Sequence, residues 1–238
     1  DNVTIDGTKK PEPNSGAVLI SDFSSSGTTV QVATLTNSTI TNNDNRGING
    51  RGFVDVTITD NTFTNNGVDA FGSGGNNGYT IRASKGATLT ASLNDITLPT
   101  SSTTRVEALH TSLTPASSIT ATNNRIIVNE NLNSQDAFGV KNSSPSTIDA
   151  TCNWWGTEDP TVISPLISNG SFTPFLIVDG TSGTSYPWDN SNDYSCTGGR
   201  IKVYNAEPFD NASFVRIHNT IQESVDASTT NNGFFVVV

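Results

Sequence analysis

The sequence is poor in the residue types on which many active sites depend. Its 238 residues include no Met, two Cys and two His. Lys and Arg number 12 against 22 Asp and Glu, which gives a net charge of -10. That balance disfavours binding to nucleic acid or to an anionic membrane surface, because both need a basic footprint. With so few His and Cys residues, neither a zinc site nor Cys-His catalysis is expected.

Long apolar runs are also missing, and no segment approaches the roughly 20 apolar residues of a membrane span. Only 33% of residues are hydrophobic. The polar residues are mainly Thr, Ser and Asn, which suit strands and turns, rather than the Lys and Glu typical of disordered chains. A β-solenoid needs few apolar residues, because each coil buries only a thin inner row that its neighbours continue. The composition therefore favours an all-β repeat fold. Because the sequence begins at Asp1 and has no Met, we expect a processed product or an excised piece.

A six-residue repeat supports this interpretation. Five segments align without gaps, with an apolar residue first, Thr or Ser second and Ile, Phe or Trp sixth; they are Leu35–Ile40, Ile58–Phe63, Ala91–Ile96, Ala121–Ile126 and Ala150–Trp155. They start at 35, 58, 91, 121 and 150, at intervals of 23, 33, 30 and 29 residues. Such intervals suit one coil of a β-helix.

Asn occupies position four in all segments but the first, where Ser38 stands. Equivalent turn positions pile up in stacked coils, and buried amides are tolerated when each bonds to the next or to turn backbone. The sequence therefore predicts an amide ladder made by Asn61, Asn94, Asn124 and Asn153. The alternative is that Asn is simply common in turns, but the shared apolar flanks favour the ladder.

The last repeat runs into Asn153-Trp154-Trp155-Gly156, followed by Pro174-Phe175-Leu176. This stretch resembles the terminal signature of secreted right-handed parallel β-helix repeat proteins, over approximately residues 15–178. The resemblance implies a right-handed parallel β-helix in residues 1–178 and a cell-surface or extracellular location. It implies little about activity, since that family includes surface proteins, adhesins, sheath-like proteins and carbohydrate-active enzymes. Trp154 and Trp155 should point to opposite faces, one filling the last coil and one anchoring the next loop. A sugar-stacking platform is the functional alternative.

Residues 179–238 are expected to form a linker, a short cap helix and a strand, because 219–238 resemble the opening of a further β-helix. Thr220 and Glu223 have capping-box spacing. The chain begins with the strand-like segment that would follow such an opening, so its end leads into its own beginning. We therefore expect head-to-tail joining of copies or tandem repeats, unless the sequence is an arbitrary piece of a longer protein. The residues assigned to this joint are Val3, Ile5, Ile221, Val225, Phe234, Phe235 and Val237.

Cys152 and Cys196 lack metal-type spacing, and in an exported protein we expect them to be oxidised. The sequence leaves open whether the disulfide lies within one chain or between chains. Glycosylation sequons, which matter only in a glycosylating host, stand at Asn2, Asn37, Asn142, Asn169 and Asn211.

Catalytic motifs are not found. Of the polygalacturonase-like pattern only Arg200-Ile201-Lys202 is present, without an Asp-Asp pair or a Gly-His-Gly segment. A pectate-lyase-like site needs an Arg beside clustered acidic calcium ligands, yet the Arg residues look scattered in the sequence: Arg46, Arg51, Arg82 and Arg105. Asp189, Ser191 and Asp193 alternate as calcium ligands do, but the Gly and distal Glu of an EF-hand loop are missing, so a plain polar linker is favoured.

We therefore predict no enzymatic activity and no cofactor, with calcium as a weak candidate. The predicted function is structural, in an extracellular layer, sheath or fibre such as an S-layer. The alternative is an adhesin or glycan-binding module, and a polysaccharide lyase or hydrolase is the least supported. The expected partners are copies of the same chain and, for the alternative, glycans.

Overall fold

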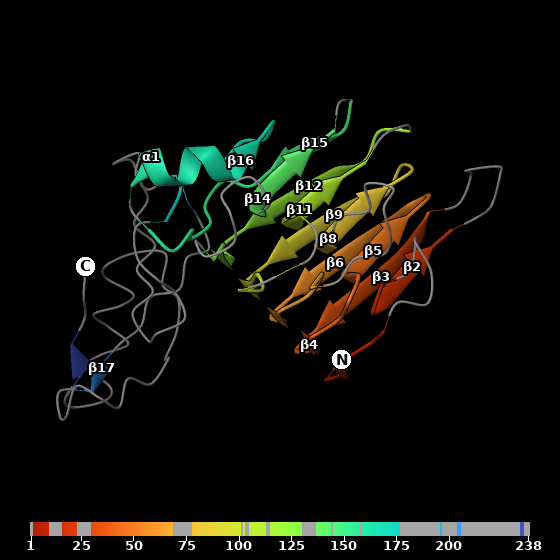
Figure 1. Ribbon diagram of the computed structural model, residues 1–238, viewed down its shortest axis with the longest axis horizontal. Helices are drawn as coiled ribbons and strands as arrows, with labels where there is room; N and C mark the ends of the chain where they lie inside the picture. The colour runs from red at the N-terminus through yellow and green to blue at the C-terminus, as the bar shows by residue number, and fades with distance from the viewer. Residues whose placement is uncertain are drawn as a thin grey trace.

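The strands of the computed structural model form three parallel sheets that wind into a β-helix (Figure 1). The structure describes residues 2–9, 16–22, 30–68, 78–100, 102, 105–112, 115–129, 137–143, 145–157, 159–176 and 196, and the backbone of 204–205 and 234–235. Along the chain, successive strands enter sheet A, sheet B and sheet C in turn, so that one circuit makes one coil. The predicted all-β parallel β-helix is thereby confirmed.

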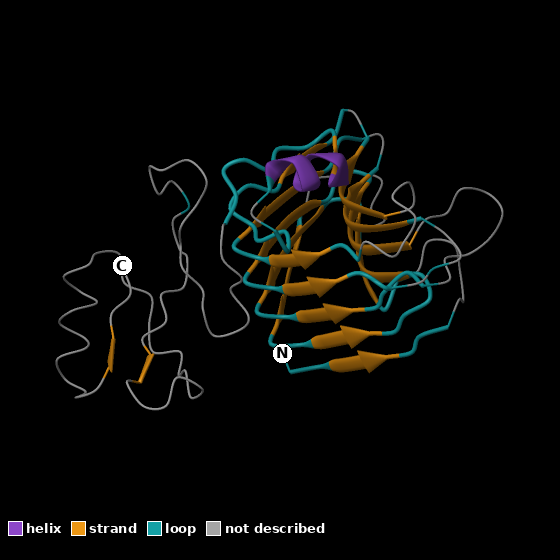
Figure 2. Cartoon of the chain, turned by 60° about the vertical axis from the view of Figure 1, so that its left-hand side comes forward, coloured by secondary structure: helices purple, strands orange, loops and turns teal. Residues whose placement is uncertain are grey.

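Each sheet is a stack of short strands from successive coils (Figure 2). Sheet A contains β1 (Thr4–Asp6), β4 (Thr39–Thr41), β7 (Thr62–Thr64), β10 (Asp95–Thr97) and β13 (Arg125–Ile127). Sheet B contains β2 (Val18–Ser21), β5 (Arg46–Arg51), β8 (Gly78–Ser84), β11 (Val106–Thr111), β14 (Ala137–Asn142) and β16 (Ile167–Ser168). Sheet C contains β3 (Gln31–Thr36), β6 (Val54–Thr59), β9 (Thr88–Ser92), β12 (Ser118–Thr122) and β15 (Thr147–Asp149).

Strand register places equivalent inward residues one above another. In β6, buried and exposed residues alternate, as a strand with one face in the core requires. The inner column of sheet A is Ile5, Ile40, Phe63, Ile96 and Ile126. The inner column of sheet C is Ala33, Val56, Leu89, Ile119 and Ile148. A single apolar residue per strand per column is enough, which explains how a chain with so few hydrophobic residues keeps a continuous core.

The six-residue repeat is the sharp turn from sheet C to sheet A. Its third residue has a positive φ in every coil, between 49° and 59°: Asn37, Asp60, Leu93, Asn123 and Cys152. Asn and Asp adopt this left-handed conformation more readily than other non-glycine residues. The bend turns the fourth residue, the predicted ladder position, into the interior.

The amide ladder is present. The backbone N–H and the side-chain Nδ2 of Asn61 both donate to Oδ1 of Asn94, each at 3.0 Å. Asn94 donates in the same way to Asn124 at 2.9 Å, and Asn124 to Asn153 at 2.8 and 2.9 Å. Each Nδ2 also donates to a carbonyl of the preceding coil, at 2.8 to 3.0 Å. Ser38 continues the column by accepting from the Val3 N–H at 3.1 Å.

The far end of the stack is closed by the segment that resembles the terminal signature. Helix α1 (Pro160–Ile163) lies beside β14 and β16, followed by the 3-10 turn η1 (Ser164–Leu166) (Figure 1). Asp159 caps α1 by accepting from the Thr161 N–H at 2.8 Å. Ile163, which ends the helix, is fully buried in the core. This helix is too short for sequence periodicity to have indicated it.

The paired Trp side chains divide as the sequence predicts. Trp155 is 3% exposed and belongs to the main core. Trp154 is half-buried and packs on a separate cluster of Cys152, Leu176 and Cys196. Both therefore have structural contacts, which leaves the sugar-platform alternative without support from the described residues.

Most of residues 179–238, including the expected cap helix, lies outside the described residues. The backbone there includes β17 (Tyr204–Asn205) and β18 (Phe234–Phe235), which pair antiparallel. The division into 1–178 and 179–238 therefore stays a prediction.

Candidate functional site

The first coil differs from those that follow because its inward side chains are only partly covered. Ile5, Val18 and Ala33 are half-buried. Their partners one coil further on are all 0% exposed, namely Ile40, Ile48 and Val56. Strands β1, β2 and β3 also stand at the edges of their sheets. This coil, which we call the open coil, therefore presents apolar surface and strands with no further described strand beyond them at one end of the stack, opposite the end closed by α1 (Figure 2).

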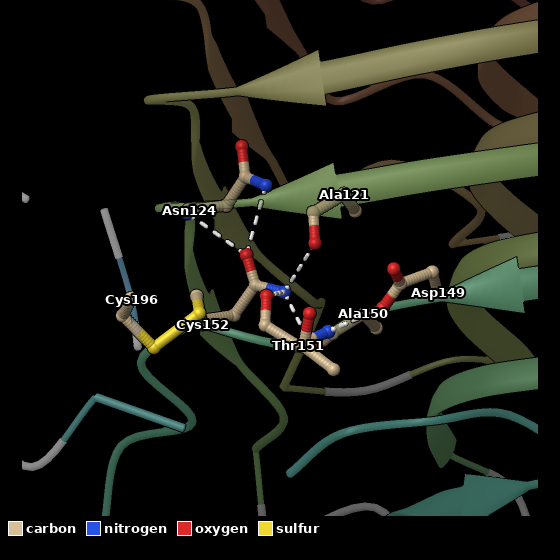
Figure 3. Close-up of a disulfide and its surroundings, with 8 residues drawn as sticks. Ala121, Asn124, Asp149, Ala150, Thr151, Cys152 and Cys196 are labelled. Atoms are coloured by element: carbon tan, nitrogen blue, oxygen red, sulfur yellow. Dashed lines mark hydrogen bonds between the residues drawn. A yellow bond between two sulfur atoms is a disulfide. The ribbon is translucent and has the colours of Figure 1, made fainter. Parts of the chain in front are cut away.

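A disulfide joins Cys152 to Cys196 within the chain (Figure 3). Their Cα atoms are 5.3 Å apart, and 44 positions separate them in the sequence. Cys152 stands at the left-handed third position of its repeat, directly before the last ladder residue, Asn153. The bridge therefore ties the segment around Cys196 to the closed end of the β-helix. The predicted oxidation is thus present, and of the two arrangements the sequence left open the structure has the intrachain one.

The outer face of sheet B carries the largest group of charged and aromatic contacts in the described part of the chain. Strand register arranges it in two columns along the β-helix axis. The first column is Arg46, Tyr79, Glu107 and Phe138, and the second is Asn49, Arg82, His110 and Lys141. We call this surface, together with Arg51 and Arg105, the cationic strip.

Each strand contributes one residue to each column, and these two residues are three positions apart in the sequence. Both nevertheless lie on the outer face. In a flat strand such residues would point to opposite faces. Here the register passes over one small residue in each strand: Gly47, Thr80, Ala108 and Gly139. The bend at that residue brings Glu107 and His110 of one strand into contact.

Glu107 is fully buried at the centre of the strip and binds two neighbours. Its Oε1 accepts from Nε of Arg105 at 2.8 Å, and its Oε2 lies 2.6 Å from Nδ1 of His110. Burial lowers the pKa of His110, although the hydrogen bond between His110 and Glu107 and the charge of Glu107 act in the opposite direction.

Aromatic rings separate the cations of the strip. The guanidinium carbons of Arg46 and Arg82 each lie 5.3 Å from the centroid of the Tyr79 ring, which stacks on His110 at 4.1 Å. On the next coils, Lys141 Nζ lies 4.1 Å from the Phe138 centroid and Arg105 lies 6.0 Å from it. Cation–π attraction compensates part of the cost of holding these charges together.

The positive charge is nevertheless crowded. Burial, followed by the charges of Arg82 and Arg51, lowers the pKa of Arg46 to about 10. Burial also lowers the pKa of Arg82. Glu107 is the single carboxylate in the two columns. The strip can thus attract an anion.

The expectation that these four Arg residues are scattered is wrong. Arg46, Arg51 and Arg82 interact with one another, and Arg105 joins the same face through Glu107. A signal was present in the sequence, in the form of four segments of four residues with the same pattern. The first and fourth residues are those of the strip, the second is small and the third is apolar: Arg46–Asn49, Tyr79–Arg82, Glu107–His110 and Phe138–Lys141. It was missed because period-two alternation assigns the ends of such a segment to opposite faces.

The predicted glycosylation sites differ in how exposed and how strongly bonded their Asn side chains are. Asn2, Asn37 and Asn169 are exposed, as glycosylation would require. Asn142 is engaged, since its Oδ1 accepts from Thr111 and its Nδ2 donates to the Ser146 carbonyl at 2.7 Å. A glycan at Asn142 would have to break these bonds.

Several predicted residues cannot be placed. Outside the described residues lie Asp189, Ser191, Asp193, Asn211, Ile221, Val225 and Val237. Within the described residues, no cluster of three or more His, Cys, Asp or Glu side chains is arranged to hold a metal ion. None of the helices described there is long and apolar enough to cross a bilayer.

Comparison with known proteins adds no relative: neither the family models, nor the curated proteins, nor the solved structures contain a match to this chain.

Proposed function

We propose that the protein is a structural unit of an extracellular layer, sheath or fibre, and that units join head to tail through the open coil. The observation that carries the proposal is the asymmetry of the stack. One end is closed by α1 and Trp155, while the other leaves Ile5, Val18 and Ala33 half-buried. A further coil placed there would bury these side chains and pair the edge strands. It can come from another molecule or from the same polypeptide.

The segment that we propose as the cover is 219–238 of the neighbouring unit. Its sequence places Ile221 and Val225 one helical turn apart, ahead of the apolar run that includes Phe234, Phe235 and Val237. A contact between two different surfaces of the same unit is heterologous, and such contacts repeat without closing unless a rotation brings them into a ring. The expected product is therefore a filament or a sheet of filaments.

An extracellular location fits the disulfide between Cys152 and Cys196, because such bonds persist in oxidising compartments. The internal amide ladder also fits a load-bearing role, since each coil is bonded to the next through side chains as well as backbone.

The test compares two substitutions that each place a carboxylate on the first coil. Ile5→Asp introduces the charge on the inner column at the open end, and Val32→Asp introduces it on an outer-face residue that is already 77% exposed. Sedimentation velocity and negative-stain electron microscopy would follow assembly with rising concentration. We expect linear polymers from the unmodified chain and from Val32→Asp, and dispersed particles from Ile5→Asp. Circular dichroism would establish that both variants are folded.

Two results would contradict the proposal. One is polymers of unchanged length from Ile5→Asp. The other is the absence of assembly by the unmodified chain at any concentration, including in a polypeptide that contains two consecutive units.

A second candidate function is a glycan-binding surface module, which the cationic strip favours. It is compatible with a structural role, because the strip lies on the flank of the stack and the open coil lies at its end. The sequence-based expectation that the protein is not an enzyme is kept in both proposals.

A further inference from the structure

Positive charge is concentrated on one face of an acidic protein. The chain has a net charge of -10, yet five of its 12 Lys and Arg residues belong to the cationic strip: Arg46, Arg51, Arg82, Arg105 and Lys141. Nothing in the β-helix itself requires this, because the outer face of sheet C carries mainly Thr, Ser and Asp. A concentration of this kind on one strip calls for a partner of opposite charge.

Not all of the strip is accessible, and the accessible part defines the contact. Arg46 is 2% exposed and Glu107 is 0% exposed, so these two form the floor of the strip. Arg51, Arg82, Arg105, Phe138 and Lys141 are half-buried and present their outer atoms to solvent. Arg guanidinium groups and the Lys ammonium form charge-assisted hydrogen bonds to carboxylates and sulfates, so these outer atoms are suitable donors.

The arrangement of these cations is linear. They come from β5, from β8, from the residue before β11 and from β14, which are successive strands of sheet B. Neighbouring coils are about 4.8 Å apart, so the strip extends about 14 Å along the axis. A compact anion would touch one coil, whereas a chain with an anionic group on successive units would touch all four.

We propose that the cationic strip binds an acidic polysaccharide, whose carboxylates or sulfates are held by Arg82, Arg105 and Lys141. This inference rests on the proposed extracellular location and on the second candidate function. Single-stranded nucleic acid is the other linear polyanion, and it fits less well. Its binding sites combine basic residues with successive exposed aromatic platforms, whereas Tyr79 in the strip is only 6% exposed and stacks on His110.

The buried floor explains why the site would be specific for anions. Burial and the charges of Arg82 and Arg51 both disfavour the cation at Arg46, so an anion above the strip relieves a repulsion that already exists. Glu107 limits the excess charge and holds Arg105 and His110 in place.

The experiment is isothermal titration calorimetry at low salt with oligogalacturonate, a heparin-derived oligosaccharide, a neutral maltooligosaccharide and a single-stranded oligonucleotide. The variants are Lys141→Gln and the double variant Arg82→Gln with Lys141→Gln. The control is Lys85→Gln, which removes the same charge from an exposed turn between β8 and β9. Thermal unfolding would check that each variant is folded, and Lys141→Gln alone keeps the test valid if the double variant is not.

We expect at least one of the two acidic oligosaccharides to bind, with a Kd that rises with salt. Lys141→Gln should raise that Kd by about tenfold, and the double variant should raise it further, because each removes a charge-assisted contact. Lys85→Gln should leave it nearly unchanged, and the neutral oligosaccharide should not bind. Binding that Lys141→Gln does not weaken, no binding of either acidic oligosaccharide, or tighter binding of the oligonucleotide would each overturn the proposal. None of these results bears on assembly through the open coil, which Ile5→Asp tests separately.

Discussion

Replacing Asn94 by alanine should destabilise the β-helix strongly, because Asn94 makes four buried hydrogen bonds in the ladder. Its Nδ2 donates to the carbonyl of Ile58 and to Oδ1 of Asn124, both at 2.9 Å. Its Oδ1 accepts from the backbone N–H and from Nδ2 of Asn61, both at 3.0 Å. At about 1 kcal/mol per bond, the expected loss of unfolding free energy is about 4 kcal/mol. The substitution also leaves the Asn61 N–H buried without its acceptor, which adds to the loss of unfolding free energy.

Serine at the same position provides a graded comparison. Ser38 already occupies the equivalent position at the N-terminal end of the ladder, where its hydroxyl accepts from the Val3 N–H at 3.1 Å. Asn94→Ser should therefore restore an acceptor for the Asn61 N–H and recover about 1–2 kcal/mol relative to Asn94→Ala. Thr90→Ala, at an exposed position of the same coil, should change stability by only about 0.5 kcal/mol.

Urea unfolding followed by circular dichroism and Trp fluorescence would measure these differences. The reasoning would be refuted if Asn94→Ala lost less than about 1 kcal/mol, a typical value for a single exposed contact, or if Asn94→Ser were no more stable than Asn94→Ala.

Three further predictions concern the disulfide, pH and the closed end. The double substitution Cys152→Asn with Cys196→Ser should lower the unfolding free energy by about 4 kcal/mol, because the disulfide no longer closes a loop of some 45 residues in the unfolded chain. Two titratable thiols in the unmodified chain would contradict this prediction. Acidification from pH 7.5 to 5.5 should lower the unfolding free energy, because the pKa of buried His110 is lower in the folded chain than in the unfolded chain, which therefore binds the proton first. If the unfolding free energy of His110→Gln fell with pH as steeply as that of the unmodified chain, His110 would not be the group responsible. Gly139→Ala should cost about 1–3 kcal/mol, because its Cβ would overlap the Trp155 ring, and a double-mutant cycle with Trp155→Leu that shows simple additivity would contradict this.

The turn repeat was the part of the fold that the sequence could predict. Its signal is local, since a left-handed third residue and an inward Asn must follow each other directly in the chain. The flanking apolar residues fall on inner columns for the same reason. The disulfide could be expected from the residue types, but not its arrangement, because two cysteines 44 positions apart place no constraint on which chain supplies the partner.

The cationic strip could not be predicted by the same rule. Its residues reach one face only because each strand of sheet B bends at a small residue, which breaks the period of two. The buried pair of Glu107 and His110 is therefore visible in three dimensions and looks in sequence like residues on opposite faces of a strand. Head-to-tail joining, which the resemblance of 219–238 to an opening segment predicts, stays a prediction; the structure shows only that Ile5 and Val18 of the first coil are half-buried.

Amide hydrogen exchange on the first coil tests the central proposal most directly. The backbone of β1, β2 and β3 is at the sheet edges, so its outward N–H groups should exchange quickly in isolated chains. In the assembled material, or in a polypeptide with two consecutive units, the same strands should become protected, while the already paired strands of sheet A from β4 to β10 should change little. Equal exchange of β1, β2 and β3 in isolated and assembled material would show that no further coil covers this end and would contradict the account.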